Sequence, residues 1–475
     1  MQIIPHQIAS FAQARVIVEP KDPARVITHL TWDSRRVIPG SLFIALPGEH
    51  ADGNDFIDEA LAKGAAVILA SRVLSEAQQE AAARDGATIL NVEAGTELES
   101  FQALARAYRS LLKATVIGIT GSSGKTTTKD LVAGVLASGL VAHATHSSYN
   151  NEIGVPATVL EADTTTKALV VEMGMQTRGE IDMLCTIAKP VIGIITNIGV
   201  AHCELLGSRE NIARAKAELI ENLPDTTGIA ILNGDDPYTP FIRQIAGTTP
   251  RNIRVLLYGL GSHNDIRAAH VEYDIEGNPS FDLWLPDGLS RRTKVSLQGE
   301  HNIYNALAAA TCGHVCGIAP ESIIKALAAV RPAAMRQETI RLASGATIIN
   351  DTYNANPDSM RAALALLSRI EHGRIHIAVL GDMFELGEEE TRFHREVGAF
   401  AHISRVDLLI TVGAMAHHIA QGARDVGMQA GNIIECDTIA SVIDVLQPYL
   451  AQGPVILVKA SRGMYLESIV EGILQ

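Results

Sequence analysis

The stretch Val116-Ile-Gly-Ile-Thr-Gly-Ser-Ser-Gly-Lys-Thr-Thr-Thr-Lys-Asp130 constrains the fold more than any other, since an apolar strand runs directly into a glycine-rich turn and a helix start. Gly121 and Gly124 let the backbone coil so that successive N–H groups point at an anion, and Lys125 adds a positive charge where the β- and γ-phosphates of a nucleotide would lie. Thr126 would then ligate Mg²⁺. The alternative is an ordinary strand–turn–helix with glycines for geometry alone. It is disfavoured because Lys-Thr-Thr directly after the second glycine has no packing purpose.

The first glycine of the strict phosphate-loop motif G-x-x-x-x-G-K-[ST] is out of register. Position 119, where it should fall, is Ile119, and the glycine is Gly118. The spacing T-G-S-S-G-K-T-T resembles the variant used by ATP-dependent amide ligases of cell-wall and folate biosynthesis. The residues expected to bind ATP in this loop are Thr120, Gly121, Ser122, Ser123, Gly124, Lys125, Thr126 and Thr127.

A chain of 475 residues is too long for one hydrophobic core, and at ~150 residues per domain it predicts about three domains. Short apolar strands alternate with helical stretches almost throughout, which is typical of α/β units on largely parallel sheets. We expect an N-terminal α/β domain over residues 1–95, a central domain with a mixed, mostly parallel sheet over residues 96–330, and a C-terminal Rossmann-like domain over residues 331–475. Glu93–Glu99 loses strand character and is the expected linker.

Most of the expected strands are short apolar runs. Between Ala268 and Leu297, polar and apolar residues instead interleave around two turns, which predicts antiparallel hairpins. The third block carries no G-x-G-x-x-G, so a dinucleotide need not be inferred. The apolar runs are Ser41–Leu46, Ala65–Leu69, Ala168–Val171, Val191–Ile195, Ile229–Leu232, Val255–Leu257, Thr347–Ile349, Ile375–Leu380, Leu408–Val412 and Val455–Val458, and helices are expected at Ala60–Lys63 and Phe101–Leu112.

Composition excludes several classes of protein. A net charge of −14 disfavours nucleic acid as a partner. No apolar run approaches the ~18 residues of a membrane span, and Met1–Gln7 lacks the pattern of a signal peptide, so we expect a cytoplasmic protein with no membrane insertion. The cysteines are few and unevenly spaced, which favours reduced thiols over a disulfide framework. Cys312, His314 and Cys316 continue an alanine-rich helix starting near Asn302, so packing is favoured there over metal binding.

Two polar residues follow apolar strands at the edge where ligands sit in open α/β sheets. Glu172 ends the strand Ala168–Val171, and its carboxylate can hold a metal; a solvated acid at a strand end is the alternative. His202 follows the next strand, and a neutral imidazole could take a further metal position. By itself, a lone histidine is more often structural.

Lys216 breaks the pattern of the helix expected after Ser208. Ile212 and Ile220 lie four residues to either side of it, so Lys216 lies on the apolar stripe of that helix, whereas Glu210, Arg214 and Glu218 are expected on the solvent side. A lysine on a core-facing stripe either extends its charge to the edge of the core or serves a site.

Three further residues are candidates for nucleotide contacts. Asn302 opens the alanine-rich helix and could read an adenine edge, with a polar helix start as the alternative. Arg336 follows the joint Pro332–Met335 between the second and third blocks and could reach across a cleft. Asp351 stands at the end of a strand before a polar loop, where it could bind ribose hydroxyls, and helix capping by that loop is the competitor.

Taken in chain order, these residues resemble the Mur ligase family over nearly the whole chain. The resemblance rests on the loop Thr120–Thr126, the strand ending at Glu172, the His202 and Lys216 segments, and Gly299-Glu-His-Asn-Ile-Tyr-Asn305. Within the family, the chain resembles the branch that adds D-alanyl-D-alanine, whereas D-Y-A-H-T-P-D and D-N-P-R of the diamino-acid-adding branch are absent. The stretches that carry this resemblance are Asp33–Phe43, Tyr149–Pro156, Asp351–Pro357 and Val379–Met383.

The resemblance implies an ATP-dependent ligase that joins D-Ala-D-Ala to UDP-N-acetylmuramoyl-tripeptide through an acyl phosphate, without a side-chain nucleophile, and a monomer is expected. Whether the third peptide residue is lysine or meso-diaminopimelate stays open. By the same resemblance, Lys125, Glu172, His202 and Lys216 form the catalytic set. The implied contacts are Ser34 and Arg35 to the uridine nucleotide, Asn150 and Asn151 to the growing peptide, Asn302, Arg336 and Asp351 to ATP, and Tyr353, Asn354 and Asn356 to D-Ala-D-Ala.

Two Mg²⁺ sites are implied, one at Thr126 and Glu172 and one at His202 and Lys216, with Lys216 carbamylated. An amine with a pKa near ~10.4 would repel two metal ions, whereas a carbamate is an anionic oxygen ligand.

The chain departs from the family pattern at two places. The late motif usually reads K-G-S-R, and Ala460 takes the place of its glycine here, which leaves the role of Lys459–Arg462 open. Cys203 stands where an aliphatic residue is more common, and we expect a packing change only.

Other functions remain as rivals. A folylpolyglutamate synthase-like enzyme is disfavoured by Asp33–Phe43, and the diamino-acid-adding sibling by Tyr353–Pro357. A phosphate-loop switch or motor would need a guanine-reading N-K-x-D, which does not occur.

Overall fold

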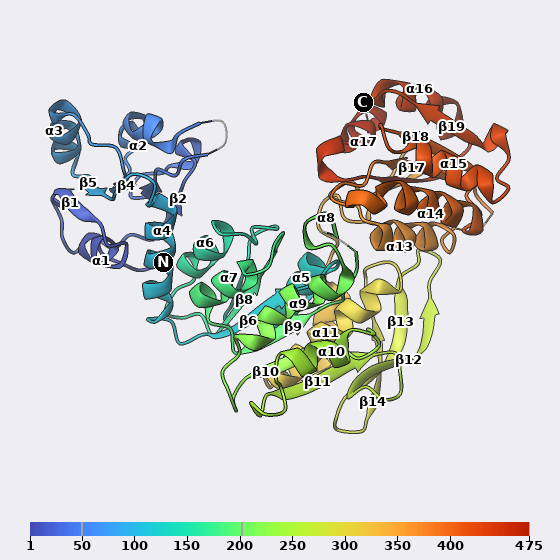
Figure 1. The fold of residues 1–475 in the computed structure, drawn as a ribbon, viewed down its shortest axis with the longest axis horizontal. Helices are drawn as coiled ribbons and strands as arrows, with labels where there is room; N and C mark the ends of the chain where they lie inside the picture. The colour runs from blue at the N-terminus through green and yellow to red at the C-terminus, as the bar shows by residue number, and fades with distance from the viewer. Residues whose placement is uncertain (49–50, 201–202, 372, 475) are drawn as a thin grey trace.

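The computed structural model describes residues 1–48, 51–200, 203–371 and 373–474. Within these ranges the chain forms three β-sheets, each in its own α/β domain. The N-terminal and C-terminal domains lie at opposite ends of the longest axis, with the central domain between them (Figure 1). The α/β class and the three domains predicted from the sequence are confirmed.

The N-terminal sheet has the strand order β1-β5-β4-β3-β2. Its strands are parallel except β1, which pairs antiparallel with β5. The bounds are β1 Arg15–Val18, β2 Leu30–Thr31, β3 Leu42–Ile44, β4 Val67–Ala70 and β5 Thr88–Asn91, with helices α1 Pro5–Phe11, α2 Ile57–Ala62 and α3 Glu76–Asp85.

The central sheet has the order β14-β13-β12-β11-β10-β9-β6-β8-β7. The strands β12, β11, β10, β9, β6, β8 and β7 pair in parallel in this order, and β12, β13 and β14 form antiparallel hairpins. The expected mixed sheet is therefore present. The bounds are β6 Thr115–Thr120, β7 Ala142–Ala144, β8 Ala168–Glu172, β9 Ile192–Ile195, β10 Ile229–Asn233, β11 Arg254–Gly259, β12 Ile266–Tyr273, β13 Pro279–Trp284 and β14 Ser290–Lys294.

Two hydrophobic cores lie on the two faces of the central sheet. One face packs against α5, α11 and α12, and the other packs against α4, α6, α7, α9 and α10. The bounds are α4 Glu97–Arg109, α5 Lys125–Ala137, α6 Gly154–Glu161, α7 Glu180–Ala188, α8 Cys203–Leu206, α9 Arg209–Glu221, α10 Thr239–Ile245, α11 His301–Val315 and α12 Pro320–Ala329. In the described part of the chain, no helix is long and apolar enough to cross a membrane.

Helix α4 joins the N-terminal and central domains into one core. Phe101, Leu104 and Tyr108 on this helix are buried in a cluster that holds side chains of both domains. The Tyr108 hydroxyl accepts a hydrogen bond from the Gln2 N–H and donates one to the Ala162 carbonyl. The prediction of a linker through Glu99 is wrong in its second half, because the helix already begins at Glu97.

The C-terminal sheet has the order β15-β16-β20-β17-β18-β19, in which β15 is antiparallel to the rest. The bounds are β15 Glu338–Arg341, β16 Thr347–Asn350, β17 His376–Gly381, β18 Leu408–Val412, β19 Ile433–Cys436 and β20 Val455–Lys459, with helices α13 Pro357–Leu367, α14 Glu390–Ile403, α15 His417–Asp425, α16 Ile439–Leu450 and α17 Glu467–Leu474.

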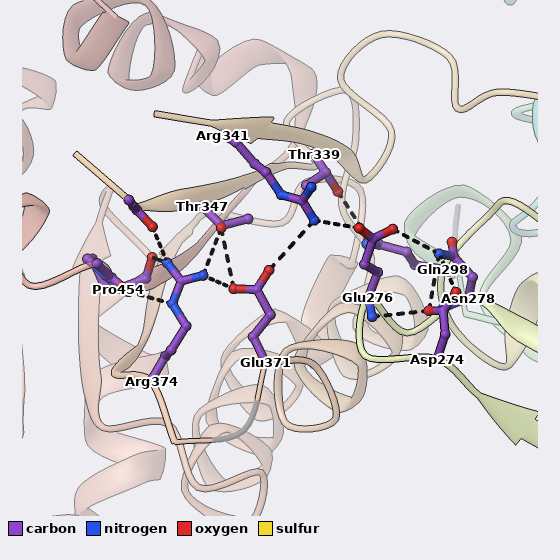
Figure 2. A network of polar contacts seen from close by, with 12 residues as sticks. Asp274, Glu276, Asn278, Gln298, Thr339, Arg341, Thr347, Glu371, Arg374 and Pro454 are labelled. Carbon is purple, nitrogen blue, oxygen red and sulfur yellow. Dashed lines mark hydrogen bonds and ion pairs between the residues drawn. The ribbon is translucent and has the colours of Figure 1, made fainter. Parts of the chain in front are cut away.

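The tip of the β12–β13 hairpin touches the C-terminal domain through a polar network (Figure 2). Arg341 on β15 donates to Glu276 at 2.6 Å and lies 3.9 Å from Glu371, which follows α13. The Glu371 N–H donates to the Ile275 carbonyl at 3.2 Å. The two domains are therefore joined by this contact as well as by the chain between α12 and β15.

Candidate functional site

The phosphate loop lies between β6 and α5, as the sequence predicts, and Asn197 anchors it from the end of β9. The Ser122 N–H donates to the Asn197 carbonyl and the Ser123 N–H to Asn197 Oδ1, both at 3.0 Å. Lys125 Nζ donates to the Gly121 carbonyl at 2.8 Å. Gly124 has φ of 76°, and a Cβ there would lie 2.6 Å from Asn305 Oδ1, so this turn admits only glycine.

Gly118, the glycine that is out of register with the strict motif, packs against the neighbouring helix α9 and takes no part in the phosphate loop. A Cβ at Gly118 would lie 2.7 Å from Leu219 Cδ1 on α9, and one at Gly193 on β9 would lie 2.9 Å from Ile220 Cδ1. The two glycines therefore let α9 approach the sheet closely. Since Lys216 precedes Leu219 by one turn, this packing brings Lys216 towards the loop.

Thr126 and Glu172 provide oxygen atoms that fit a hard cation. Glu172 is 1% exposed, and its Oε1 accepts from Asn150 Nδ2 at 2.7 Å. Its buried Oε2 has no hydrogen-bond partner among the residues that the structure describes. Thr126 Oγ1 lies 3.2 Å from Ser148 Oγ. A buried carboxylate oxygen without a partner is costly, and hydroxyl and carboxylate oxygens are the ligands that Mg²⁺ prefers, so the residues present fit this ion.

Lys216 is buried and Lys125 is half-buried on the cavity wall, and the Lys125 charge is close enough to act on Lys216. Burial lowers the pKa of Lys125, while the Glu172 carboxylate opposes that shift. Lys216 is 1% exposed, and burial, followed by the Lys125 charge, holds its pKa well below the ordinary value. The prediction that Lys216 faces the core is thus confirmed. His202, the other candidate for the second metal site, lies outside the described residues.

The expectation for Glu218 is wrong. Its side chain is 5% exposed instead of facing solvent. It accepts the Gly179 N–H at 2.7 Å and the Asp182 N–H at 3.1 Å, so it caps the start of α7. Burial raises the pKa of Glu218, and the two N–H donors counter that rise. The cause is that the N–H groups at the start of α7 need an acceptor, which the facing helix supplies.

Arg336 bridges the central and C-terminal domains. Its Nη2 donates to Ser148 Oγ at 3.1 Å, and its guanidinium lies 3.9 Å from the centre of the Tyr353 ring. Asn302 is buried; its Nδ2 donates to the Gln298 carbonyl at 2.7 Å and its Oδ1 accepts from Asn305 at 2.8 Å. The Arg336 guanidinium is therefore close to the phosphate side of the site, whereas the Asn302 amide is engaged by α11 and by the residues just before it.

The loop Tyr353–Pro357 is held by two residues of Lys459–Arg462. Lys459 Nζ donates to the Asn354 carbonyl at 2.8 Å and pairs with Asp351 at 2.7 Å. Ser461 Oγ donates to the Ala355 carbonyl at 3.3 Å. Ala460 is buried against Gly381, which has no side chain, and this explains how alanine replaces the usual glycine.

A cavity of about 1160 Å³ brings most of the predicted site residues together. Its walls come from both the central and the C-terminal domain. The predicted residues that line it are Ser122, Ser123, Gly124, Lys125, Thr126, Thr127, Asn150, Asn151, Glu172, Asn302, Arg336, Asp351, Tyr353, Asn354 and Asn356.

The cavity does not reach Ser34 and Arg35. Ser34 Oγ donates to Glu59 at 2.8 Å, and Arg35 makes two hydrogen bonds to the Asp33 carboxylate, at 2.9 and 2.8 Å. Both belong to the N-terminal domain, which lies at the opposite end of the molecule from the C-terminal domain (Figure 1). Thr120, Gly121 and Lys216 lie behind the cavity wall and not on it.

Two residues of the site, Ser148 and Asn197, were not singled out from the sequence, and a third, Lys459, belongs to the stretch Lys459–Arg462 whose role the sequence leaves open. Ser148 lies between Thr126 and Arg336, Asn197 anchors the phosphate loop, and Lys459 pairs with Asp351. Asn197 lies two residues beyond the end of β9, and Glu172 is the last residue of β8, so the same reasoning from strand ends could have found Asn197. The partners of Ser148 and Lys459 depend on tertiary contacts.

Models of three domain families match the chain. They are the Mur ligase family catalytic domain over residues 26–161, the Mur ligase middle domain over residues 119–313, and the Mur ligase glutamate ligase domain over residues 335–462.

Relatives with assigned names match over nearly the whole chain. The UDP-N-acetylmuramoyl-tripeptide–D-alanyl-D-alanine ligase of Bacillus subtilis is 37% identical over 97% of this chain and 96% of its own length, and that of Escherichia coli is 33% identical over 94% and 93%. Among solved structures, MurF from Acinetobacter baumannii has a TM-score of 0.85 at 29% identity, covering 100% of this chain and 99% of that one. MurF from Thermotoga maritima in complex with ADP has a TM-score of 0.79 at 28% identity, with 94% and 97% covered. Because the match spans all three domains and the site between them, the chain belongs to the Mur ligase family, in its MurF branch.

Proposed function

We propose that this chain joins D-alanyl-D-alanine to UDP-N-acetylmuramoyl-tripeptide at the expense of ATP, producing the pentapeptide precursor of peptidoglycan. The observation that carries the proposal is the cavity in which the phosphate loop, Glu172 and the loop Tyr353–Pro357 face one another. A ligase of this kind must hold a nucleotide, a carboxylate and an amine within reacting distance, and residues of two domains meet here to do so. The names of the relatives support the same activity.

The reaction needs activation, because a carboxylate and an amine do not condense in water. The terminal carboxylate of the tripeptide attacks the γ-phosphorus of ATP, the bond to ADP breaks, and an acyl phosphate forms. The amine of D-Ala-D-Ala attacks the acyl carbon and loses a proton, and the resulting tetrahedral intermediate expels phosphate. Lys125 and the N–H groups of the phosphate loop stabilise charge on the transferred group, so the protein acts by positioning and electrostatics.

Thr126 and Glu172 would hold Mg²⁺ at the nucleotide. The unpartnered Oε2 of Glu172 supports this assignment, since a bound cation would satisfy it. When bound, the ion neutralises charge on phosphate oxygens. Asn150 fixes the orientation of the carboxylate through its hydrogen bond to Oε1.

A second Mg²⁺ held by His202 and a carbamylated Lys216 is part of the proposal. The low pKa of Lys216 supports it, because only an uncharged amine can attack CO₂. In that step the Nζ–C bond forms and Nζ loses a proton, which leaves a carbamate whose oxygens suit Mg²⁺.

The assignment of Ser34 and Arg35 to the uridine nucleotide requires a substrate that extends from the N-terminal to the central domain. Both side chains already have carboxylate partners, Glu59 and Asp33, which a bound nucleotide would have to share or displace. The monomeric state and the cytoplasmic location stay predictions.

Phosphate release tests the function directly. We expect release with ATP, UDP-N-acetylmuramoyl-tripeptide and D-Ala-D-Ala, and none with the dipeptide precursor and a diamino acid. Testing tripeptides that end in lysine and in meso-diaminopimelate would identify the third residue. Activity with the dipeptide pair alone would overturn the assignment to D-Ala-D-Ala addition.

Carbamylation has its own test. With ¹³C-bicarbonate, we expect a carbamate carbon signal in the wild-type protein that Lys216→Ala lacks, together with a nearly inactive variant. Lys113→Ala, at an exposed position of the same domain, should keep both the signal and the activity. Full activity in Lys216→Ala would remove this residue from the site.

A further inference from the structure

Lys129 is a buried lysine of the central domain whose role is not explained by the site described above. It lies on α5, one turn after Lys125, and is 3% exposed. Its Nζ donates to the carbonyls of Thr145 and Ser147, both at 2.9 Å, and lies 2.8 Å from Asp130 Oδ1. These three partners match the three N–H donors of an ammonium group, so the charge is fully satisfied inside the protein.

Both carbonyls belong to the turn Thr145–Asn150, which follows β7. Ser147 in this turn has φ of 51°, a left-handed conformation that costs a residue other than glycine about 1 kcal/mol or more. Such a conformation persists only where the surroundings fix it. The two hydrogen bonds from Lys129, one on each side of His146, provide that constraint.

Side chains of the same turn contact both candidate metal ligands, Thr126 and Glu172. Ser148 Oγ lies 3.2 Å from Thr126 Oγ1. Asn150 Nδ2 donates to Glu172 Oε1 at 2.7 Å, and Thr145 Oγ1 accepts the Glu172 N–H at 3.0 Å. The position of the turn therefore determines where the Thr126 hydroxyl and the Glu172 carboxylate lie relative to each other.

We propose that Lys129 is a positioning residue that fixes the Thr145–Asn150 turn and thereby sets the affinity of the nucleotide site for Mg²⁺. The proposal rests on the function proposed above. A lysine that only tied α5 to the sheet would bond to strand carbonyls alone, whereas the Ser147 carbonyl lies in the turn, beyond Thr145, whose N–H is the last to pair with β8.

The role of Lys129 can be tested by measuring Mn²⁺ affinity. Electron paramagnetic resonance monitors Mn²⁺ binding while a non-hydrolysable ATP analogue is present. Partners that orient metal ligands typically contribute 10–100-fold to metal affinity, so we expect the Mn²⁺ dissociation constant of Lys129→Met to rise about 10-fold or more. Lys129→Arg keeps donors for both carbonyls and should stay within about twofold of the wild type. Nucleotide affinity measured in EDTA should change little in either variant, because Asn197 and not the turn anchors the loop amides.

Lys167→Met is the matched control, because it makes the same change at an exposed lysine of the same domain, and it should bind Mn²⁺ as the wild type does. If Lys129→Met does not fold, Lys129→Gln, which keeps a neutral NH₂ group on a shorter side chain, should show a rise of about threefold. Unchanged Mn²⁺ affinity in a folded Met or Gln variant would overturn the role of Lys129. Failure of the wild type to bind Mn²⁺ with the nucleotide would overturn the nucleotide site itself.

Discussion

Two lysines of the site, the half-buried Lys125 and the buried Lys216, differ in the charges that act on them. Lys125 donates to the Gly121 carbonyl, and the Glu172 charge favours its protonated form. The Lys125 charge, in turn, disfavours protonation of Lys216. Burial lowers the pKa of both amines, but the Glu172 charge opposes this shift at Lys125 whereas the Lys125 charge adds to it at Lys216, and a lowered pKa at Lys216 is the direction that carbamylation requires.

Lys125→Ala should abolish turnover, because the charge opposite the transferred phosphoryl group is lost while the loop amides remain. Removal of one such group typically costs 10²–10³-fold in kcat, so we expect a loss of at least about 100-fold. The measurement is phosphate release at saturating ATP, with circular dichroism to show that the fold is intact. Lys113→Ala, an exposed lysine of the same domain, should behave as the wild type. Near-normal ligation by Lys125→Ala would contradict the assignment of the phosphate loop.

The sequence predicts single residues well where local periodicity decides and poorly where a distant helix decides. Lys216 could be placed in the core because Ile212 and Ile220 flank it at helical spacing. Glu218 occupies a position that periodicity assigns to solvent, yet it is buried because α7 lies against it. No pattern within α9 carries that information.

The N-cap of helix α13, Asn356, also lines the cavity. Asn356 Oδ1 accepts the Ser359 N–H at 2.8 Å, and Ser359 Oγ accepts the Asn356 N–H at 3.0 Å, which forms a capping box. Asn356→Ala should lower the free energy of unfolding by about 1 kcal/mol, and Asn356→Ser should restore most of it. If Asn356 also contacts D-Ala-D-Ala, both variants should raise the KM for D-Ala-D-Ala more than that for ATP. Equal shifts in the two KM values would contradict that contact.

Buried His394 on α14 makes the stability of the C-terminal domain depend on pH. Its Nε2 accepts the Met383 N–H at 3.0 Å and its Nδ1 donates to the Glu390 carbonyl at 2.8 Å, so the ring is neutral in the folded state. Burial lowers the pKa of His394. Below a pH of about 6.5 the unfolded chain therefore binds a proton that the folded chain does not, and stability falls as pH falls, by up to ~1.4 kcal/mol per pH unit.

Chemical unfolding between pH 7.5 and 5.5 checks this expectation. His394→Gln should be less stable at pH 7.5 but should lose less stability on acidification. His402→Gln on the same helix keeps the buried histidine and should retain the wild-type pH dependence. An equal pH dependence in His394→Gln and the wild type would show that another group titrates.

The expected strands with clear apolar runs are all present, whereas the strands that the sequence does not indicate are short. β7, with the sequence Ala142-His-Ala144, is too short to show alternation and takes its conformation from pairing with β8. β15, with alternating half-buried and exposed residues, lies at a sheet edge and pairs only with β16 in the described sheet. Such strands depend on a neighbour that a local pattern does not reveal.

On the scale of the whole molecule, the site is divided between domains that are joined in different ways. The N-terminal domain shares a hydrophobic core with the central domain through α4. The C-terminal domain instead has its own cores and meets the central domain at the cavity and at the β12–β13 hairpin tip. Motifs in the sequence predict which residues belong to the site, but the spacing of the two domains depends on contacts between them, which no motif indicates.

Gly277 at the hairpin tip offers a test of how that contact orients the C-terminal domain. Its φ is 81°, and a Cβ there would lie 2.6 Å from Ile370 Cγ2 and 2.9 Å from Leu366 Cδ1. Gly277→Val should therefore push the tip away from the end of α13 and disturb the neighbouring Arg341–Glu276 pair (Figure 2). Since small misplacements of reacting groups cost large factors in rate, we expect kcat/KM to fall by about 10-fold or more.

Gly288 in the next hairpin provides the matched control. Its φ is 76°, and nothing lies within 4 Å of a Cβ built there, so Gly288→Val adds the same backbone strain without the contact. Both variants should lose about 1–2 kcal/mol of stability from the left-handed backbone. Only Gly277→Val should also change the radius of gyration in X-ray scattering and lower kcat/KM. Equal activity in the two variants would mean that the hairpin contact does not set the orientation of the C-terminal domain, and that the other contacts between the two domains, such as Arg336 with Ser148, do so.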